Sequence, residues 1–369
     1  MTVLLDARAS RRPSGIANYA FALAREFGRL APREVTPICH RRHARAVRDF
    51  GLEPWVTGRA VLDPSRLPDA SVVHGPNYGA LDHPTAARVV TIHDVGFLTL
   101  PECHPPGMPE RLDALIRGSL HRVDAFVCDS RDTHDEFLNR YGVAPERCAV
   151  IPLGVDASRF RARDRRVLPS TLRLRYRLRR PYVLFVGAMV PRKDLVTLLE
   201  AFARIRPEHP DLELVIAGHK TRRWASDWPR VKAWLRGHPE DARRVRILNF
   251  VPSRDLPALY AHCAVVALTS LLEGFGLTVL EGLACGRPVV ATRVGAVSEI
   301  GEDAVYYGEV RDADSIADAL LAALRGDDRE RRRRRGADIV ARHSWRRTAE
   351  QTLDVYKAVA ADRPPVEVA

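Results

Sequence analysis

Short apolar segments alternate with helical patterns along most of the sequence, and this alternation limits the fold more than any other feature. The segments are rich in valine and isoleucine, as is typical of strands buried on both faces of a parallel sheet. Repeated strand–helix units predict parallel sheets with helices on both faces. The predicted strands form two series: Val3–Ala7, Val72–Gly75, Arg88–His93, Ala125–Asp129 and Ala149–Pro152, then Tyr182–Gly187, Leu212–Gly218, Val245–Asn249, Ala264–Thr269, Pro288–Thr292 and Ala304–Tyr307.

The two series of strands predict two doubly wound domains. The charged stretch 154–180 separates them, has no strong apolar period, and is interpreted as the linker region. We expect an N-terminal domain over residues 1–165 and a C-terminal domain over 175–344. A final amphipathic helix, within 345–362, is expected to pack back on the first domain. A length of 369 residues agrees with two domains, because a single core rarely grows past about 250–300 residues.

The composition indicates a globular chain, with 46% hydrophobic and 28% charged residues. No apolar run approaches the roughly 20 residues that span a membrane, and the N-terminus lacks a signal-peptide pattern. The six cysteines form no Cys-x-x-Cys pair, which favours small buried thiols in a reducing compartment. We therefore expect a cytoplasmic protein.

A net charge of +12 favours anionic partners: phosphorylated ligands, nucleic acid or an anionic membrane surface. No helix-turn-helix, zinc or RRM signature accompanies the charge, so nucleic-acid binding is a remote alternative. The run Arg331–Arg335 is interpreted as a solvated helix face or a loop. Contact with the inner face of a membrane is a further hypothesis, which fails if anionic vesicles do not bind the protein at low salt.

The stretch Leu271–Thr292, LLEGFGLTVLEGLACGRPVVAT, carries the sharpest chemical signal. Glu273 follows a predicted strand, at the edge where ligands bind in open α/β sheets. A helix is expected to begin near Leu277, and the N–H groups of its first turn, with the helix dipole, predict a phosphate site. Glu281 lies about one turn into that helix, where a carboxylate can bind a vicinal diol such as ribose. The backbone expected at the phosphate comprises Gly274, Phe275, Gly276, Leu277 and Thr278.

This stretch resembles the E-x7-E motif of retaining glycosyltransferases of the GT-B fold, in the large group 1 (family 4) class. The resemblance covers nearly the whole chain. It implies an α/β fold in which two Rossmann-like domains face each other across a cleft. The N-terminal domain would bind the acceptor, and the C-terminal domain would bind the nucleotide-sugar.

Further segments match the same family. In FVGAMVPRKDL, a basic pair that binds the donor diphosphate corresponds to Arg192 and Lys193, and the P-R-K order resembles a mannosyltransferase-like branch. In PSGIANYAFAL, Gly15 corresponds to the family's N-terminal glycine loop. In VVTIHDVGFL, His93 corresponds to a histidine that contacts the donor sugar, and Asp94 is expected to orient an acceptor hydroxyl. The loops after VIAGHK and at NFVP imply a nucleobase pocket at Gly218 and Val251.

The resemblance implies transfer of a hexose from a nucleotide-diphosphate sugar to a hydroxyl of a glycan, lipid-linked or small-molecule acceptor, with retention of configuration. GDP-mannose is the expected donor, from the P-R-K order alone. UDP-sugar or dTDP-sugar transferases and a sugar-nucleotide epimerase stay open as alternatives. No metal or other cofactor is expected, because Arg192 and Lys193 would supply the positive charge. The acidic Asp312–Asp314 segment is interpreted as a helix cap and not a metal site.

Overall fold

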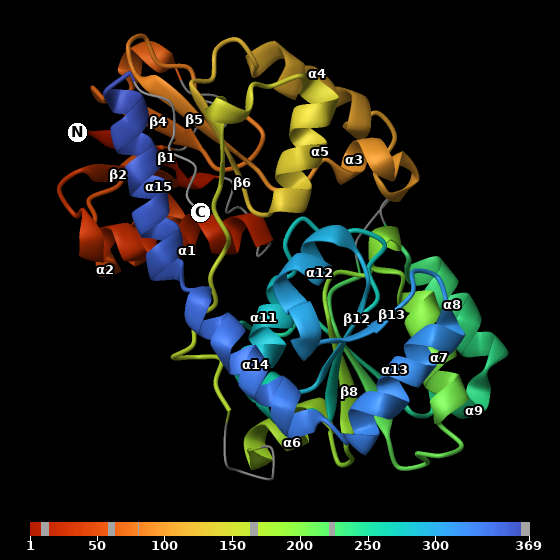
Figure 1. Ribbon diagram of the computed structural model, residues 1–369. Helices are drawn as coiled ribbons and strands as arrows, with labels where there is room; N and C mark the ends of the chain where they lie inside the picture. Colours follow the sequence, from red (N-terminus) through yellow and green to blue (C-terminus); the bar gives the residue numbers. More distant parts are fainter. Residues whose placement is uncertain (9–14, 58–62, 80, 163–168, 221–225, 363–369) are drawn as a thin grey trace. The chain divides into compact units, whose positions relative to one another are not determined.

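The computed structural model describes residues 1–8, 15–57, 63–79, 81–162, 169–220 and 226–362 (Figure 1). The chain divides into two compact units. The first comprises Met1–Thr99, Gly107–Gly154 and His343–Ala369, and the second comprises Leu100–Pro106 and Val155–Arg342.

Within the described residues, the first unit contains a seven-stranded parallel sheet of order β3-β2-β1-β4-β5-β6-β7. The order reverses direction between β1 and β4, which makes this pair the switch point of the sheet. The strands are β1 Val3–Asp6, β2 Val35–His40, β3 Trp55–Thr57, β4 Val72–Gly75, β5 Ala87–Ile92, β6 Ala125–Cys128 and β7 Cys148–Val150.

Alternate residues of β5 show how helices cover the two faces of this sheet. Val90 and Ile92 pack into an apolar cluster with side chains of α4 and α5. Thr91, between them, bonds to the hydroxyl of Tyr19 on α1. Helix α15 lies against α1 and contacts β4 and β5 (Figure 1). The helices are α1 Gly15–Leu30, α2 Ala44–Asp49, α3 Gly96–Thr99, α4 Met108–Ser119, α5 Arg131–Tyr141 and α15 Trp345–Ala360, with short 3₁₀ turns η2 Arg41–His43, η3 Pro64–Arg66 and η5 Pro145–Arg147.

The second unit contains a parallel sheet of order β10-β9-β8-β11-β12-β13, which is six-stranded within the described residues. Its switch point lies between β8 and β11. The strands are β8 Tyr182–Val186, β9 Glu213–Ala217, β10 Val245–Asn249, β11 Val265–Leu268, β12 Val289–Thr292 and β13 Tyr306–Gly308.

Helices α7 and α13 pack together over one face of the second sheet, while α11 and α14 pack together over the other (Figure 1). The first face carries an apolar core in which Phe202 of α7 and Leu320 of α13 are fully buried. The helices are α6 Ser170–Tyr176, α7 Leu195–Ile205, α8 Trp228–Gly237, α9 Pro239–Ala242, α10 Leu256–His262, α11 Leu277–Ala284, α12 Gly295–Gly301, α13 Ala313–Arg325 and α14 Arg329–Arg342, with 3₁₀ turns η4 Pro101–Cys103, η6 Pro191–Lys193 and η7 Glu302–Ala304.

The two doubly wound sheets confirm the predicted fold class, but the predictions missed β2 and β3. Pro37 lies inside β2, and proline inside a strand normally argues against a central strand. It is tolerated because pairing with β3 begins only at Ile38, so Pro37 pairs with β1 alone. The linker prediction also missed α6, whose residues lack an apolar period and are all at least partly exposed.

Two other local predictions are confirmed. All six cysteines are buried and free. Asp312 caps α13, since its Oδ1 accepts hydrogen bonds from the N–H groups of Asp314 and Ser315. Among the described residues, the helices are all too short or too polar to cross a membrane.

Candidate functional site in the second unit

The strongest candidate site lies at the switch point of the second sheet. Strands β8 and β11 are neighbours, and the loop after each carries charged side chains. The loop after β8 ends in η6, which presents Arg192 and Lys193, and the loop after β11 carries Glu273. In open α/β sheets, the carboxyl ends of strands beside the switch point form the usual ligand site.

Hydrogen bonds join these two loops. The N–H of Leu271 donates to the Arg192 carbonyl at 2.7 Å. The Thr269 hydroxyl donates to the carbonyls of Lys193 and Asp194, at 3.1 and 3.2 Å. Asp194 has a positive φ of 43° and turns the chain into α7, where the Thr197 hydroxyl donates to its carboxylate. The basic turn is therefore held rigidly against the loop that carries the glutamate.

Glu273 is at the centre of a charged cluster. Its side chain is only 9% exposed and forms ion pairs with Lys193 and with Arg192, the latter at 3.1 Å. Arg192 also donates to the Leu272 carbonyl at 2.8 Å, and the Ser270 hydroxyl donates to the Glu273 carboxylate. The structure thus brings together three of the predicted site residues.

Two cations around one carboxylate leave the cluster with a net positive charge. Burial on its own would raise the pKa of Glu273, but the charges of Lys193 and Arg192, with hydrogen bonds from Lys193 and Ser270, lower that pKa to about 2. The carboxylate is therefore ionised at neutral pH and orients both cations. A net positive charge beside an ordered loop suits an anionic ligand.

Helix α11 begins beside this cluster, as predicted, at Leu277. Gly276 has a φ of 104°, which only glycine adopts without strain, and no side chain caps the helix. The N–H groups of Leu277 and Thr278 lie in the first turn and have no carbonyl four residues earlier inside the helix. These N–H groups and the helix dipole favour a bound anion.

Glu281 lies farther along the same helix and is partly buried. Burial raises the pKa of its carboxyl to about 7, although the Tyr260 hydroxyl and the Arg159 guanidinium lower it. A carboxyl that is partly protonated at neutral pH can both donate to and accept from hydroxyl groups. This property suits the predicted contact with a diol.

The predicted nucleobase residues lie at the ends of β9 and β10. Gly218 is needed for packing, because a Cβ there would lie 1.6 Å from the Gly187 carbonyl oxygen. The nearby Lys220 ammonium lies 3.6 Å from the centre of the Trp228 ring. Val251 is buried after β10, while Phe250 beside it is 57% exposed. Gly274 and Phe275 precede α11, and Phe275 is buried.

In the first unit, Gly15 is the first residue of α1, and Pro13 and Ser14 of the predicted loop lie outside the described residues. His93 and Asp94 follow β5. Both imidazole nitrogens of His93 are hydrogen-bonded, Nδ1 to Asp129 and Nε2 to the Pro76 carbonyl. The Asp94 carboxylate accepts from the Gly96 N–H at 3.0 Å and from the Tyr78 hydroxyl at 3.3 Å.

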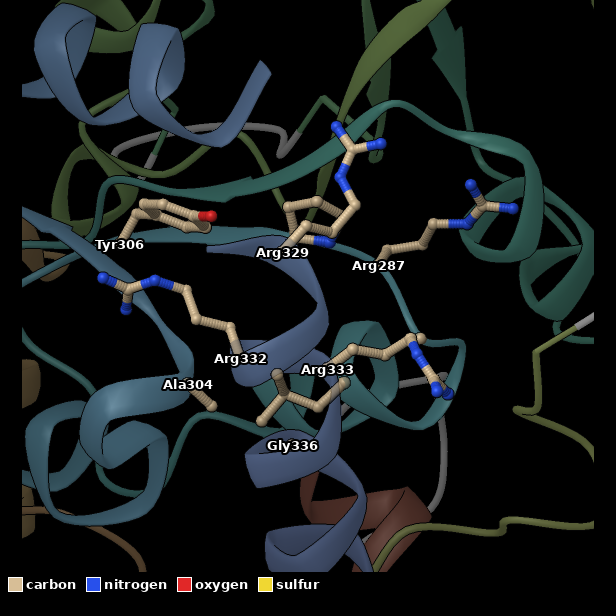
Figure 2. A pocket seen from close by; sticks show the side chains of 10 residues that line it. Arg287, Ala304, Tyr306, Arg329, Arg332, Arg333 and Gly336 are labelled. Carbon is tan, nitrogen blue, oxygen red and sulfur yellow. The ribbon is translucent and has the colours of Figure 1, made fainter. Parts of the chain in front are cut away.

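The arginine-rich helix α14 borders a hollow in the second unit, but this hollow is a poor ligand site. Its volume is about 10 Å³, enough for one water molecule at most. The labelled guanidinium groups point away from one another and not toward a common centre (Figure 2). The guanidinium carbon of Arg332 lies 4.1 Å from the centre of the Tyr306 ring, and Arg333 forms an ion pair with Glu330.

Sequence reasoning missed the partners of the predicted residues: Ser270, Tyr260, Pro76 and Asp129. Asp129 carried a usable signal, because it ends a predicted strand and polar residues at strand ends meet at one edge of a sheet. The other three have no local signal, since their contacts depend on how the loops fold.

Comparison with known proteins agrees with this geometry. The family model described as glycosyl transferases group 1 matches residues 173–338, and the model for glycosyltransferase family 4 matches residues 13–159. The O-antigen chain mannosyltransferase B of Escherichia coli is 31% identical over 294 residues, which cover 78% of this chain and 74% of that protein. A D-inositol 3-phosphate glycosyltransferase of Salinispora tropica is 35% identical over 253 residues, and this chain spans only 52% of its length.

Solved structures show the same fold. The crystal structure of Anabaena HepE in complex with UDP and glucose has a TM-score of 0.75, at 16% identity, over 97% of this chain and all of that one. Taken with the two matching family models and the E. coli relative, this likeness identifies the chain as a glycosyltransferase of the group 1 class, with the GT-B fold.

Proposed function

We propose that the protein transfers a hexose from a nucleotide-diphosphate sugar to an acceptor hydroxyl and retains the anomeric configuration. The observation that carries this proposal is the cluster of Arg192, Lys193 and Glu273 beside the uncapped start of α11. This cluster combines net positive charge with free N–H groups, which is what a diphosphate requires. The second unit would therefore hold the donor, and the first unit would hold the acceptor.

In the proposed reaction, the bond between the sugar C1 and the diphosphate oxygen breaks while a bond from C1 to the acceptor oxygen forms. The acceptor proton moves to the departing diphosphate oxygen, so no enzymic nucleophile is needed. Negative charge develops on the diphosphate as the bond breaks. Lys193, Arg192 and the first-turn N–H groups of α11 would stabilise this charge more in the transition state than in the ground state.

Mannose from GDP-mannose is the proposed donor group. The P-R-K turn at Pro191–Lys193 and the mannosyltransferase activity named for the E. coli relative support it. UDP-sugars are the main competing donors, since the HepE crystals contain UDP and glucose. The proposed acceptor is a hydroxyl of a glycan, a glycolipid or a small molecule.

The test is release of nucleotide from GDP-mannose, UDP-glucose, UDP-GlcNAc and dTDP-rhamnose, each with a mixture of simple hexosides as acceptors. We expect release from one donor, predominantly GDP-mannose, and product with the donor's anomeric configuration. Release that is equal in the wild type and in Glu273→Ala would point to a contaminant. Absence of release from all four donors would overturn the proposal.

Metal independence is a separate prediction. Because two cationic side chains face the proposed diphosphate position, we expect the rate of release to persist in EDTA. The measurement is the initial rate before and after dialysis against EDTA, with added Mg²⁺ as the comparison. A rate that disappears on chelation and returns with Mg²⁺ would contradict the proposed role of the basic pair.

A further inference from the structure

His93 joins three strand ends of the first unit. His93 follows β5, Asp129 follows β6 and Pro76 follows β4. The Nδ1 atom of His93 lies 2.6 Å from Oδ2 of Asp129, and its Nε2 atom lies 2.9 Å from the carbonyl oxygen of Pro76. The side chains of His93 and Asp129 are 12% and 3% exposed. The imidazole therefore bridges two loops from an almost water-free position.

The identity of the two partners fixes the number of protons on the pair. A peptide carbonyl can only accept a hydrogen bond, so Nε2 must carry a proton. The ionised carboxylate of Asp129 is also only an acceptor, so the contact at Nδ1 then requires a second proton on the ring. We propose that His93 is held doubly protonated between Asp129 and Pro76, and that it acts as a strap positioning the turn at residues 76–79, with Asp129 as its positioning residue.

The neighbouring histidine, His74, shows the opposite arrangement. Its ring nitrogens lie 2.6 Å from the Tyr356 hydroxyl and 2.8 Å from the Thr91 hydroxyl, and a hydroxyl can donate or accept. A neutral ring satisfies both contacts, and burial lowers the pKa of His74 to about 3. One buried histidine is thus built to be neutral and the other to be charged.

The groups around His93 favour its charge. Burial opposes the charge, but Asp129, the Pro76 carbonyl and Asp94 raise its pKa above the ordinary value. Burial raises the pKa of Asp129, although His93 lowers it. Among the described residues, the other titratable groups that face the ring are Tyr19 on α1 and the neutral His74 on β4. The centre of the Tyr19 ring lies 5.1 Å from that of His93, in an edge-on arrangement. No described residue donates a hydrogen bond to Oδ1 of Asp129, which is also buried.

The turn held by this strap is strained and close to Asp94. Tyr78 has a positive φ of 56°, and its hydroxyl donates to the Asp94 carboxylate. Loss of the proton on Nε2 would place a nitrogen lone pair against the Pro76 carbonyl oxygen, which is repulsive. The strap is therefore present below the raised pKa of His93 and is lost as the pH rises through it. In this state, neither ring nitrogen is free to contact a substrate.

The strap predicts an NMR signature that requires no substrate. With ¹⁵N-labelled histidine and His93→Asn for assignment, His93 should show protons on both ring nitrogens at pH 7, and His74 on one. Asp129→Asn should lower the pKa of His93 by roughly 1–3 units, the usual effect of removing an adjacent opposite charge. Asp135→Asn is the matched control, because Asp135 pairs with His134 in the same unit but is 72% exposed.

A singly protonated His93 in the wild type at pH 7 would overturn the inference, even if Asp129→Asn did not fold. So would a pKa of His93 that Asp129→Asn leaves unchanged. The link to catalysis rests on the proposed function: the alkaline limb of the pH–kcat profile should follow the NMR pKa and shift down with it in Asp129→Asn. A limb that does not shift would refute the positioning role, whereas no nucleotide release at any pH would refute the proposed function.

Discussion

Replacing Lys193 by alanine should lower kcat for nucleotide release by about 10²–10³-fold, the typical effect of removing one preorganised donor to a developing negative charge. Lys193 is held in place by its ion pair with Glu273 and by its backbone contact with Thr269, so little reorganisation is needed during the reaction. The measurement is steady-state release from the preferred donor, with kcat and KM determined separately.

Lys232→Ala is the control for this change, since Lys232 is an exposed lysine on α8. It should leave kcat within about twofold of the wild type, because isolated surface charges contribute little. A small loss in Lys193→Ala, or a loss that appears only in KM, would mean that Lys193 binds the donor uniformly without acting in the transition state.

Replacing Glu273 by glutamine should both reduce activity and destabilise the protein. The change leaves Lys193, only 12% exposed, without its counter-ion, and breaking one partner of a buried pair typically costs about 3–5 kcal/mol. Activity should fall by at least about 10²-fold, because the basic pair loses the group that orients it. Denaturant unfolding and nucleotide release on the same preparations measure the two effects, and Glu208→Gln, an exposed change on the surface, is the control.

The stability difference between the wild type and Glu273→Gln should depend on pH in a defined direction. A folded-state pKa of about 2, below the ordinary value of 4.5, gives stability that is complete above pH 4.5 and lost as the pH falls toward 2. The part of the unfolding free energy that depends on the ionisation of Glu273 is on the order of 3 kcal/mol. The two proteins should therefore converge in acid. A constant difference from pH 6 to pH 3 would show that folding does not lower the pKa of Glu273.

The sequence could predict the part of the site that depends on strand ends and on local glycine chemistry. Glu273 was expected at the carboxyl end of a strand, whereas Arg192 and Lys193 were assigned to the donor diphosphate through the family resemblance. In the structure the three side chains form one ion-paired cluster. The limits of α11 also followed from local residues. Gly276 and Gly286 both adopt positive φ, at the start of the helix and just beyond its end.

What the sequence could not predict depends on contacts between distant segments. The pairing of His93 with Asp129 spans 36 residues and exists because β5 and β6 are neighbours. Strand β2 was missed because Pro37 breaks the local pattern. Within the sheet, Pro37 pairs only with β1, although β2 as a whole pairs with both β1 and β3. The charge of a histidine was equally hidden, since the partners that distinguish His74 from His93 come from distant segments.

We expect a nucleoside diphosphate to bind at the basic pair beside α11. Calorimetric titration of GDP and UDP into the wild type and into Arg192→Ala/Lys193→Ala tests it most directly, at fixed ionic strength and with unfolding midpoints compared. We expect the wild type to prefer one of the two nucleotides, and the folded double variant to bind it at least about 100-fold more weakly, since two charge-assisted contacts are lost. Equal affinity in the folded double variant, or no binding of either nucleotide to the wild type, would contradict the account.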